Sequence, residues 1–322
     1  MKILVTGSKG VVGQKLVPEL QKRGHYVFGV DLLHHPGEIG FSQRMSQEKW
    51  TYSRCDIGEY RQLERVFREA GPFDLVYNCA AEFGRWNGED YYEQVWKSNL
   101  IGLKNIIRLQ EELGFQLVHF SSSEVYGDYE DIMFEDIMDK VEIKQLNDYA
   151  ISKWANEMQI RNSIKMFDTK TVIVRLFNTY GPGEYYHPYR SVNCKFCYHA
   201  LNKLPITVYR EHFRSSTYVD DCVFTVSNIS ENFIPGRVYN IGSTQFHDIE
   251  TLADIIWNYT KSPRELIEYK ESEVLTTKIK KVNMDLSLDE LDHKETISLE
   301  EGVKRTVDWM KEYYNLTIKM NL

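Results

Sequence analysis

The chain has 322 residues, 42% of them hydrophobic, so it can bury a large core in one domain with an appended lobe or in two modest domains. Its 39 basic and 47 acidic residues leave a net charge of -8, which gives no electrostatic reason to expect nucleic acid or an anionic membrane as a partner. The five cysteines, an odd number scattered along the chain, suit a reducing compartment better than a disulfide framework.

The N-terminus runs directly from Met1 and Lys2 into a strand-like ILVTG, without the pattern of a secretory signal peptide. No later stretch approaches membrane-spanning length. We therefore expect a cytoplasmic protein.

Short apolar runs alternate with longer amphipathic runs over the first half of the chain. About six strands are expected there, and the helices should cover residues 11–24, 60–71, 92–112 and 148–166. The clearest strands are at residues 2–7, 26–31, 74–81, 116–123 and 171–178. This alternation predicts an α/β fold whose doubly wound parallel sheet is covered by helices on both faces.

The alternation decays after residue 178 into a stretch rich in aromatic and polar residues. Further strands are expected at residues 205–209, 216–221 and 237–242, and a capping box from Ser298 to Glu301 predicts a closing amphipathic helix. We expect a first domain over residues 1–177 with a returning segment near 213–240, and a smaller substrate-binding lobe over 178–212 and 241–322.

The first strand leads into a glycine-rich turn at the start of the next helix. Gly7, Gly10, Val12 and Gly13 lie in this turn, where backbone amides and the positive helix end can meet a pyrophosphate. Asp31 closes the second strand at the separation expected for a carboxylate that binds the adenosine ribose. The pattern predicts a Rossmann-type NAD site, because the anion repels the 2'-phosphate of NADP; the alternative is a set of turn glycines and a surface aspartate.

Two smaller features leave alternatives open. Asp56 and Ile57 could flank the adenine, or Asp56 could cap the following helix. Cys194 and Cys197 form a lone C-x-x-C without a second pair at a suitable spacing, so we expect helix-borne thiols and no metal.

Tyr149 and Lys153 are four residues apart on a predicted helix and therefore share one face. The ammonium, with a positive nicotinamide nearby, would favour the phenolate of the tyrosine, which could then accept the proton of a sugar hydroxyl. Ser122, at the end of a strand, would hydrogen-bond the same hydroxyl. A single Y-x-x-x-K is common in helices, so the assignment depends on the motifs around it.

Five motifs occur in order along the chain: G-x-x-G-x-x-G, N-C-A-A at 78–81, S-S-S-E-V-Y-G at 121–127, Y-A-I-S-K at 149–153 and R-L-F-N-T-Y-G-P at 175–182. Together they closely resemble the extended short-chain dehydrogenase/reductases, specifically the NAD-dependent epimerase/dehydratase group acting on nucleotide sugars. The resemblance covers nearly the whole chain. It implies a nucleotide-diphosphate sugar as substrate and a homodimer.

The same resemblance implies roles for single residues. Ser122, Tyr149 and Lys153 would be catalytic, with Lys153 also binding the nicotinamide ribose. Ala80 and Ala81 would line the cofactor, and Asn99 would stabilise the central helix. Asn178 and Arg214 would contact the substrate diphosphate, as would Arg190, although a surface ion pair is the alternative for either arginine.

Glu124 bears on the fate of the ketone that oxidation at sugar C4 would produce. The resemblance links a glutamate before V-Y-G to 4,6-dehydratases and decarboxylases, and a carboxylate there could remove the C5 proton. We therefore expect a 4,6-dehydratase, with 4-epimerisation, net 4-dehydrogenation and decarboxylation as alternatives.

Several neighbours qualify this prediction. Ser123 stands where one dehydratase class has an aspartate, and residues 278–281 carry lysines where decarboxylases carry paired arginines. Glu82 and Arg85 belong to an unusual segment that could contact the sugar. An inactive NAD-binding regulator is the alternative from another class, although such a protein would not need the acid–base residues.

Overall fold

The computed structural model describes residues 1–33 and 51–320, the last five of them as backbone only. Seven parallel strands form the central sheet in the order β10-β7-β5-β4-β1-β2-β3. They are β1 (Lys2–Thr6), β2 (Tyr26–Asp31), β3 (Tyr52–Arg54), β4 (Leu75–Asn78), β5 (Gln116–Ser122), β7 (Thr171–Leu176) and β10 (Val238–Ile241). The order reverses direction between β1 and β4, which opens a crevice at the carboxyl ends of these strands.

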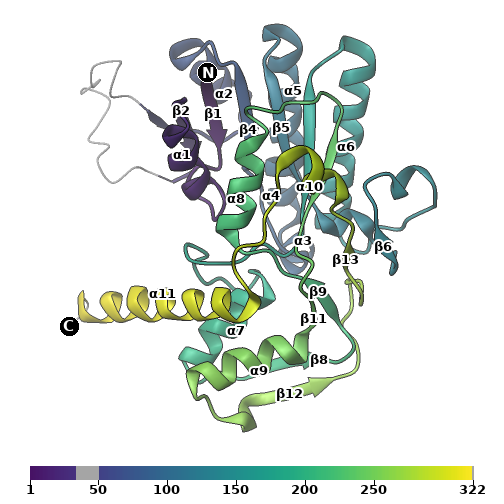
Figure 1. Cartoon of the computed structure of the whole chain (residues 1–322). Helices are drawn as coiled ribbons and strands as arrows, with labels where there is room; N and C mark the ends of the chain where they lie inside the picture. Colours follow the sequence, from purple (N-terminus) through teal and green to yellow (C-terminus); the bar gives the residue numbers. More distant parts are fainter. Residues whose placement is uncertain (34–50, 321–322) are drawn as a thin grey trace.

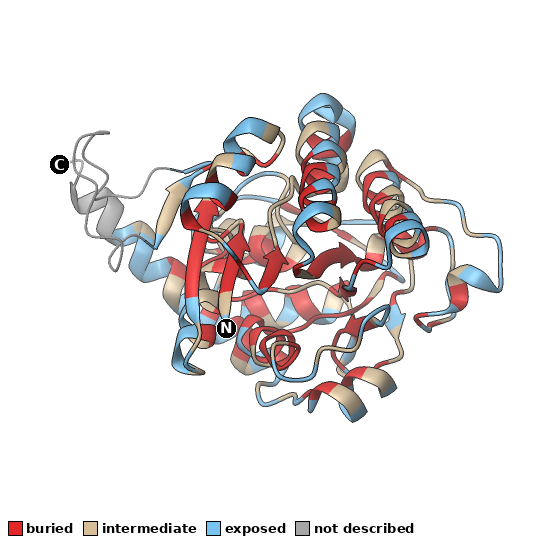
Figure 2. Cartoon of the chain, turned by 90° about the horizontal axis from the view of Figure 1, so that it is seen from above, coloured by how far each residue is buried: buried red, intermediate tan, exposed pale blue. Residues whose placement is uncertain are grey.

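Helices cover both faces of the sheet, as Figures 1 and 2 show, so the central strands β1, β4, β5 and β7 are almost entirely buried. One face packs against α1 (Gly13–Lys22), α8 (Val219–Asn228) and α10 (Asp285–Leu291). The other packs against α2 (Tyr60–Ala70), α5 (Gly102–Leu113) and α6 (Asp148–Phe167). The predicted α/β doubly wound fold is confirmed, and continuous apolar strands are its physical cause because neither face meets water.

The helix expected over residues 92–112 is built from three pieces. They are α4 (Tyr92–Val95), the π-helical η2 (Trp96–Ile101) and α5, and α3 (Arg85–Asp90) precedes them. Short elements between β5 and α6 are η3 (Ser123–Tyr126), β6 (Ile132–Met133) and η4 (Ile137–Asp139).

A second core lies below the sheet in the view of Figure 1, between α7, α9 and α11. Its elements are α7 (Val192–Leu201), β8 (Ile206–Tyr209), α9 (Ile249–Thr260), η5 (Arg264–Leu266), β12 (Ile267–Lys270) and α11 (Leu299–Met320). The pairs β8–β12, β9 (Phe213–Ser215)–β11 (Phe246–Asp248) and β6–β13 (Lys281–Val282) form small two-stranded sheets. The Ser298 hydroxyl accepts the Glu301 N–H at 3.3 Å and starts α11 as predicted.

One predicted strand is wrong. Residues 216–221 do not form a strand, because α8 begins at Val219. Asp220 and Asp221 lie in the first turn of that helix, where acidic side chains oppose the positive end of the helix dipole. The Asp221 carboxylate also accepts the Thr296 N–H at 3.0 Å, so it ties the helix start to a distant loop. No helix in the described part of the chain is long and apolar enough to cross a membrane.

Candidate active site

The turn between β1 and α1 can take only glycine at two of its positions. Gly7 has φ +65°, and a Cβ there would lie 2.7 Å from the Ala80 nitrogen. A Cβ on Gly13 would lie 2.2 Å from the Gly7 carbonyl oxygen. Val12 precedes the helix without a side-chain cap, so the first amides of α1 keep no side-chain partner. This cradle fits a pyrophosphate at the helix N-terminus.

Asp31 lies beside this turn at the end of β2. Its carboxylate accepts the Lys9 N–H at 2.9 Å and the Leu33 N–H at 3.2 Å, which fixes the side chain and leaves lone pairs for ribose hydroxyls. The Lys9 ammonium lies over the Tyr52 ring, 4.8 Å from its centroid. The positive charge of Lys9 is therefore held over an aromatic ring. The negative charge of Asp31 repels a 2'-phosphate and so favours NAD over NADP.

Asp56 and Ile57 line the same cavity. The Asp56 carboxylate accepts the Gly58 N–H at 2.9 Å and pairs with Lys97 at 3.1 Å. The alternative that Asp56 caps α2 is wrong, because Glu59 holds the position before the helix.

Asn99 stands apart from the other cofactor residues because it does not line the cavity. Its side chain accepts the Glu82 N–H at 2.9 Å, and its amide donates to the Glu82 carbonyl at 3.2 Å and the Ser152 hydroxyl at 3.0 Å. Asn99 thus fastens the loop after β4 to α6, and it acts on the site through that loop.

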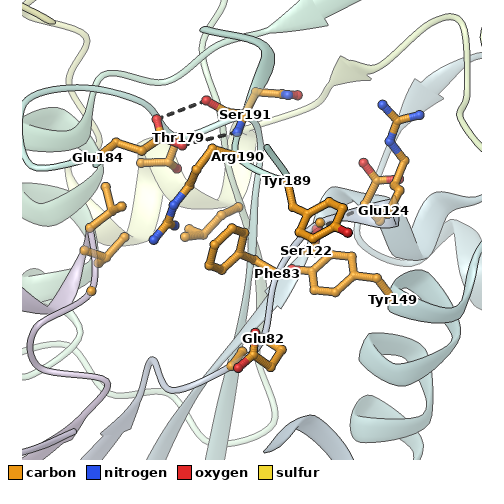
Figure 3. Close-up of a pocket in the computed structure, with 18 of the residues that line it drawn as sticks. Glu82, Phe83, Ser122, Glu124, Tyr149, Thr179, Glu184, Tyr189, Arg190 and Ser191 are labelled. Carbon is orange, nitrogen blue, oxygen red and sulfur yellow. Dashed lines mark hydrogen bonds between the residues drawn. The ribbon is translucent and has the colours of Figure 1, made fainter. Parts of the chain in front are cut away.

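One cavity of about 950 Å³ contains the remaining predicted site residues. These are Gly7, Gly10, Val12, Gly13, Asp31, Asp56, Ile57, Ala80, Ala81, Glu82, Arg85, Ser122, Ser123, Glu124, Tyr149, Lys153, Asn178, Arg190 and Arg214. Figure 3 shows Tyr149, Ser122 and Glu124 toward one side of the cavity and Arg190 and Glu184 toward the other.

The catalytic candidates come from two adjacent elements. Ser122 ends β5, while Tyr149 and Lys153 lie in the first turns of α6, where Asn147 caps the helix by accepting the Ala150 N–H at 2.8 Å. The Lys153 ammonium donates to the Phe120 carbonyl at 2.8 Å, and burial lowers its pKa to about 8.

The protein's own residues do not make Tyr149 a phenolate. Burial raises the pKa of its phenol to about 12, the Glu124 charge adds to this, and a hydrogen bond with Ser122 opposes it. The Lys153 ammonium lies 5.9 Å from the centroid of the tyrosine ring. Lys153 was predicted to favour the phenolate of Tyr149. To lower the pKa of Tyr149, it needs the positive charge of the oxidised cofactor as well.

A model of the NAD-dependent epimerase/dehydratase family matches residues 3–242. The chain belongs to this family. It is therefore an NAD-dependent enzyme, as the glycine turn and Asp31 predicted, and the residues around that turn fit the cofactor.

Individual relatives align along almost their whole length. Protein CapI of Staphylococcus aureus is 28% identical over 342 positions, which cover 98% of this chain and 99% of the relative. A UDP-glucuronate 4-epimerase of Thermodesulfobacterium geofontis is 28% identical over 333 positions, which cover 97% of each chain. The solved structure of epimerase Mth375 from Methanothermobacter thermautotrophicus is similar with a TM-score of 0.86 at 28% identity, covering 99% of this chain and 94% of that one.

In this epimerase/dehydratase chain, Glu124 carries a buried ion pair. The Lys280 ammonium donates to its carboxylate from a position that does not line the cavity. Burial alone would raise the pKa of Glu124, but Lys280, Arg85 and Arg214 outweigh burial and hold the pKa at about 2. Of the lysines at 278–281, Lys280 is the one that pairs with Glu124.

Neither Arg214 nor Arg190 forms a surface ion pair among the described residues. Arg214 is 5% exposed and donates to the carbonyls of Phe213 and Lys278, each at 2.8 Å. Arg190 lies over the Phe83 ring at 3.6 Å from its centroid, with a buried Nε that has no partner among the described residues. Arg85 pairs with Glu273 at 3.0 Å.

Phe83, Glu184, Lys195 and Glu273 are among the cavity-lining residues that sequence reasoning did not single out. Glu184 is buried and accepts the Ser191 hydroxyl at 3.0 Å. Phe83 had a sequence signal, since it lies in the unusual segment between Glu82 and Arg85. Glu184 follows the motif at 175–182 and Lys195 lies inside the C-x-x-C, but neither motif indicated a role for them, and Glu273 lies far from any motif.

The aromatic run at 185–189 divides between the cavity and the lobe. Tyr185 and Tyr189 line the cavity, whereas Tyr186 stacks on Tyr198 with ring centroids 3.7 Å apart. The two buried thiols of the C-x-x-C, Cys194 and Cys197, belong to the lobe core on α7.

Proposed function

We propose that this chain is an NAD-dependent 4-epimerase of a UDP-sugar. The proposal rests on a contrast within the cavity, between the groups that would serve oxidation and reduction and the carboxylate that would serve elimination. Ser122, Tyr149 and Lys153 are placed for oxidation and reduction at a sugar carbon, whereas the carboxylate that elimination would need is neutralised by a buried lysine.

The protein's residues would move one proton in each direction. Tyr149 would accept the proton of the C4 hydroxyl and return it after the ketone has been presented from its other face. Ser122 would hydrogen-bond the same oxygen, and Lys153 would hold positive charge near the phenol. The bound cofactor supplies the acceptor and donor of the C4 hydride.

Glu124 is a poor candidate for the base in a 4,6-dehydration. A carboxylate with a pKa of about 2 binds protons weakly, and proton transfer is most efficient when the pKa of the base lies near the working pH. Accepting a proton would also leave the Lys280 ammonium buried opposite a neutral acid, which is costly.

The UDP moiety is proposed from the relatives and the shape of the cavity. The Thermodesulfobacterium relative is named for a UDP-sugar, and it aligns with this chain from end to end. A cavity of about 950 Å³ lies at the upper end of the range for small-molecule sites, which suits a dinucleotide and a nucleotide sugar together. We assign Asn178, Arg190 and Arg214 to the substrate diphosphate, and Ser123, Glu82 and Arg85 to the sugar.

A 4,6-dehydratase is the second candidate, and one observation favours it. Glu124 lines the cavity beside Ser122, and its charge acts on the Tyr149 phenol. It is therefore near the reacting sugar even though its charge is neutralised from behind.

The test is product analysis with a panel of UDP-glucose, UDP-N-acetylglucosamine and UDP-glucuronate. We expect a product of unchanged mass whose C4 configuration is inverted, as seen by mass spectrometry and proton NMR. Tyr149→Phe should lower the rate by about 10²- to 10⁴-fold, because the proton carrier is lost. Tyr269→Phe, on an exposed strand of the other lobe, is the matched control and should leave the rate unchanged.

Other products would replace the proposal. Loss of water would show a dehydratase, loss of carbon dioxide a decarboxylase, and loss of hydrogen with accumulated NADH a net 4-dehydrogenase. Bound NAD without turnover of any of the three sugars would contradict 4-epimerisation of this panel.

A further inference from the structure

Six lysines and arginines of the described chain line the cavity, and five of them have partners there or beside it. Lys9 lies over Tyr52, Arg190 over Phe83, Arg85 pairs with Glu273, and Lys153 and Arg214 donate to carbonyl groups. The sixth is Lys195, whose ammonium makes no hydrogen bond or close ion pair with any residue that the structure describes. Its three N–H donors are therefore available to a ligand.

The helix that carries Lys195 is firmly anchored. Ser191 caps α7 by accepting the Cys194 N–H at 3.1 Å, and the opposite side of the helix is buried in the lobe core. Ser191, Val192 and Lys195 all line the cavity, so the ammonium lies on the same side as the positive end of its helix. Lys195 is half-buried, which restricts its side chain before any ligand binds.

The charges around Lys195 belong to the substrate side of the cavity. Its electrostatic neighbours are Glu273, which favours its charged form, and Arg85, which opposes it. Glu273 also acts on Arg214, so three cations share one carboxylate. Glu124 also acts on Arg85 and Arg214, but its own charge is paired with Lys280, so this group of three cations keeps a net positive charge that suits a diphosphate.

We propose that Lys195 binds the diphosphate of the nucleotide-sugar substrate, with Glu273 as the resident carboxylate that the diphosphate displaces from this group of cations. The proposal rests on the proposed function only in taking a nucleoside-diphosphate sugar as substrate. It does not depend on the fate of the sugar. Arg214 has already committed one guanidinium nitrogen to two carbonyls and another to the Thr276 hydroxyl, which is why a second cation is needed.

A pyrophosphate could also come from the cofactor, and the experiment separates the two sources. The NAD-loaded protein is titrated with UDP and with uridine by calorimetry, and the cofactor-free protein is titrated with NAD. In Lys195→Gln we expect the Kd of UDP to rise about 10-fold or more, because a charge-assisted contact is lost, while the Kd values of uridine and NAD stay unchanged.

Three further variants make the result specific. Lys195→Arg keeps the charge and should retain most of the UDP affinity, whereas Lys304→Gln removes an exposed lysine from α11 and should change nothing. Glu273→Gln should bind UDP more tightly than the native protein, since it removes the competing carboxylate. A purely structural role of either residue would not strengthen binding.

The outcomes also separate this proposal from 4-epimerisation. Unchanged UDP affinity in Lys195→Gln would overturn the role of Lys195, and weakened NAD binding instead would assign it to the cofactor. A selective loss of UDP affinity would support the role even if product analysis shows dehydration or decarboxylation. Thermal unfolding of each variant checks that the lobe is folded.

Discussion

Two buried ion pairs lie close to the candidate catalytic residues and are built in different ways. Arg175 on β7 and Glu157 on α6 are both fully buried and joined by two hydrogen bonds, of 3.0 and 2.7 Å. Arg175 also donates to the Tyr126 hydroxyl at 2.8 Å, and Glu157 accepts the Ser121 hydroxyl at 2.6 Å. This pair does not line the cavity and connects the strands and helix behind it.

The second pair, Lys280 with Glu124, is joined by one hydrogen bond and has one partner at the cavity wall. Lys280 is almost fully buried, whereas the Glu124 side chain is 18% exposed toward the site. A pair held by several hydrogen bonds is rigid, while a pair joined by one hydrogen bond and open to the cavity can respond to a ligand. Both pairs are buried, so burial alone does not distinguish the pair that supports the fold from the pair at the cavity. The number of hydrogen bonds does.

The largest effect should come from breaking the first pair. Arg175→Met leaves the Glu157 carboxylate buried without its cation, which costs about 3–5 kcal/mol of folding stability. Urea unfolding followed by tryptophan fluorescence measures the loss. The double variant Arg175→Met/Glu157→Leu removes the orphan charge and should recover part of it. A single variant as stable as the double variant would contradict the role of this pair as framework.

The second pair should respond to alkaline pH, which the first cannot, because arginine stays protonated. Burial lowers the pKa of Lys280 to about 8 against the opposing effect of Glu124. Between pH 8 and the ordinary lysine pKa of 10.5, the unfolded chain binds a proton that the folded protein has released. Stability from this group therefore rises with pH over that window, by at most roughly 3 kcal/mol.

The measurement compares native protein with Lys280→Met at several pH values. The free energy of unfolding of the native protein should increase relative to that of the variant as pH rises through about 8. Lys278→Met, two positions away with its side chain 43% exposed, is the matched control, and its stability should follow that of the native protein at every pH. A constant difference across this range would mean that Lys280 does not titrate there.

The sequence was enough to predict the sheet and the cofactor side of the site, because both depend on local patterns. Continuous apolar strands predicted β1, β2, β4, β5 and β7, and the glycine turn follows from steric limits within a few residues. Tyr149 and Lys153 share a helix face by spacing alone. Each of these features is determined by neighbours along the chain, which a single sequence displays.

The side of the cavity that we assign to the substrate could not be predicted in the same way. Lys280 meets Glu124 across 156 positions, and Arg85 meets Glu273 across 188. No periodicity encodes such contacts, so the lysines at 278–281 indicated positive charge without indicating which one is buried. The strand expected at 216–221 failed for a related reason: the apolar and aromatic pattern there suits a strand, but Asp221 meets a partner 75 positions away at the start of a helix.

The smallest effect separates the two candidate reactions. If Glu124 transfers no proton during the reaction, Glu124→Gln should slow 4-epimerisation by less than about tenfold, because the amide fills the same space. A tenfold change in rate corresponds to about 1.4 kcal/mol in the activation free energy. A dehydratase would instead lose elimination by about 10²-fold or more, since a general base is removed. Glu142→Gln, an exposed glutamate in the segment before α6, serves as the matched control in the same rate measurement. Lys280 loses its counter-charge in Glu124→Gln, but it can release its proton and become neutral. Glu124→Gln should therefore destabilise the fold much less than Arg175→Met does. A large loss of rate with unchanged stability would show that Glu124 takes part in the reaction.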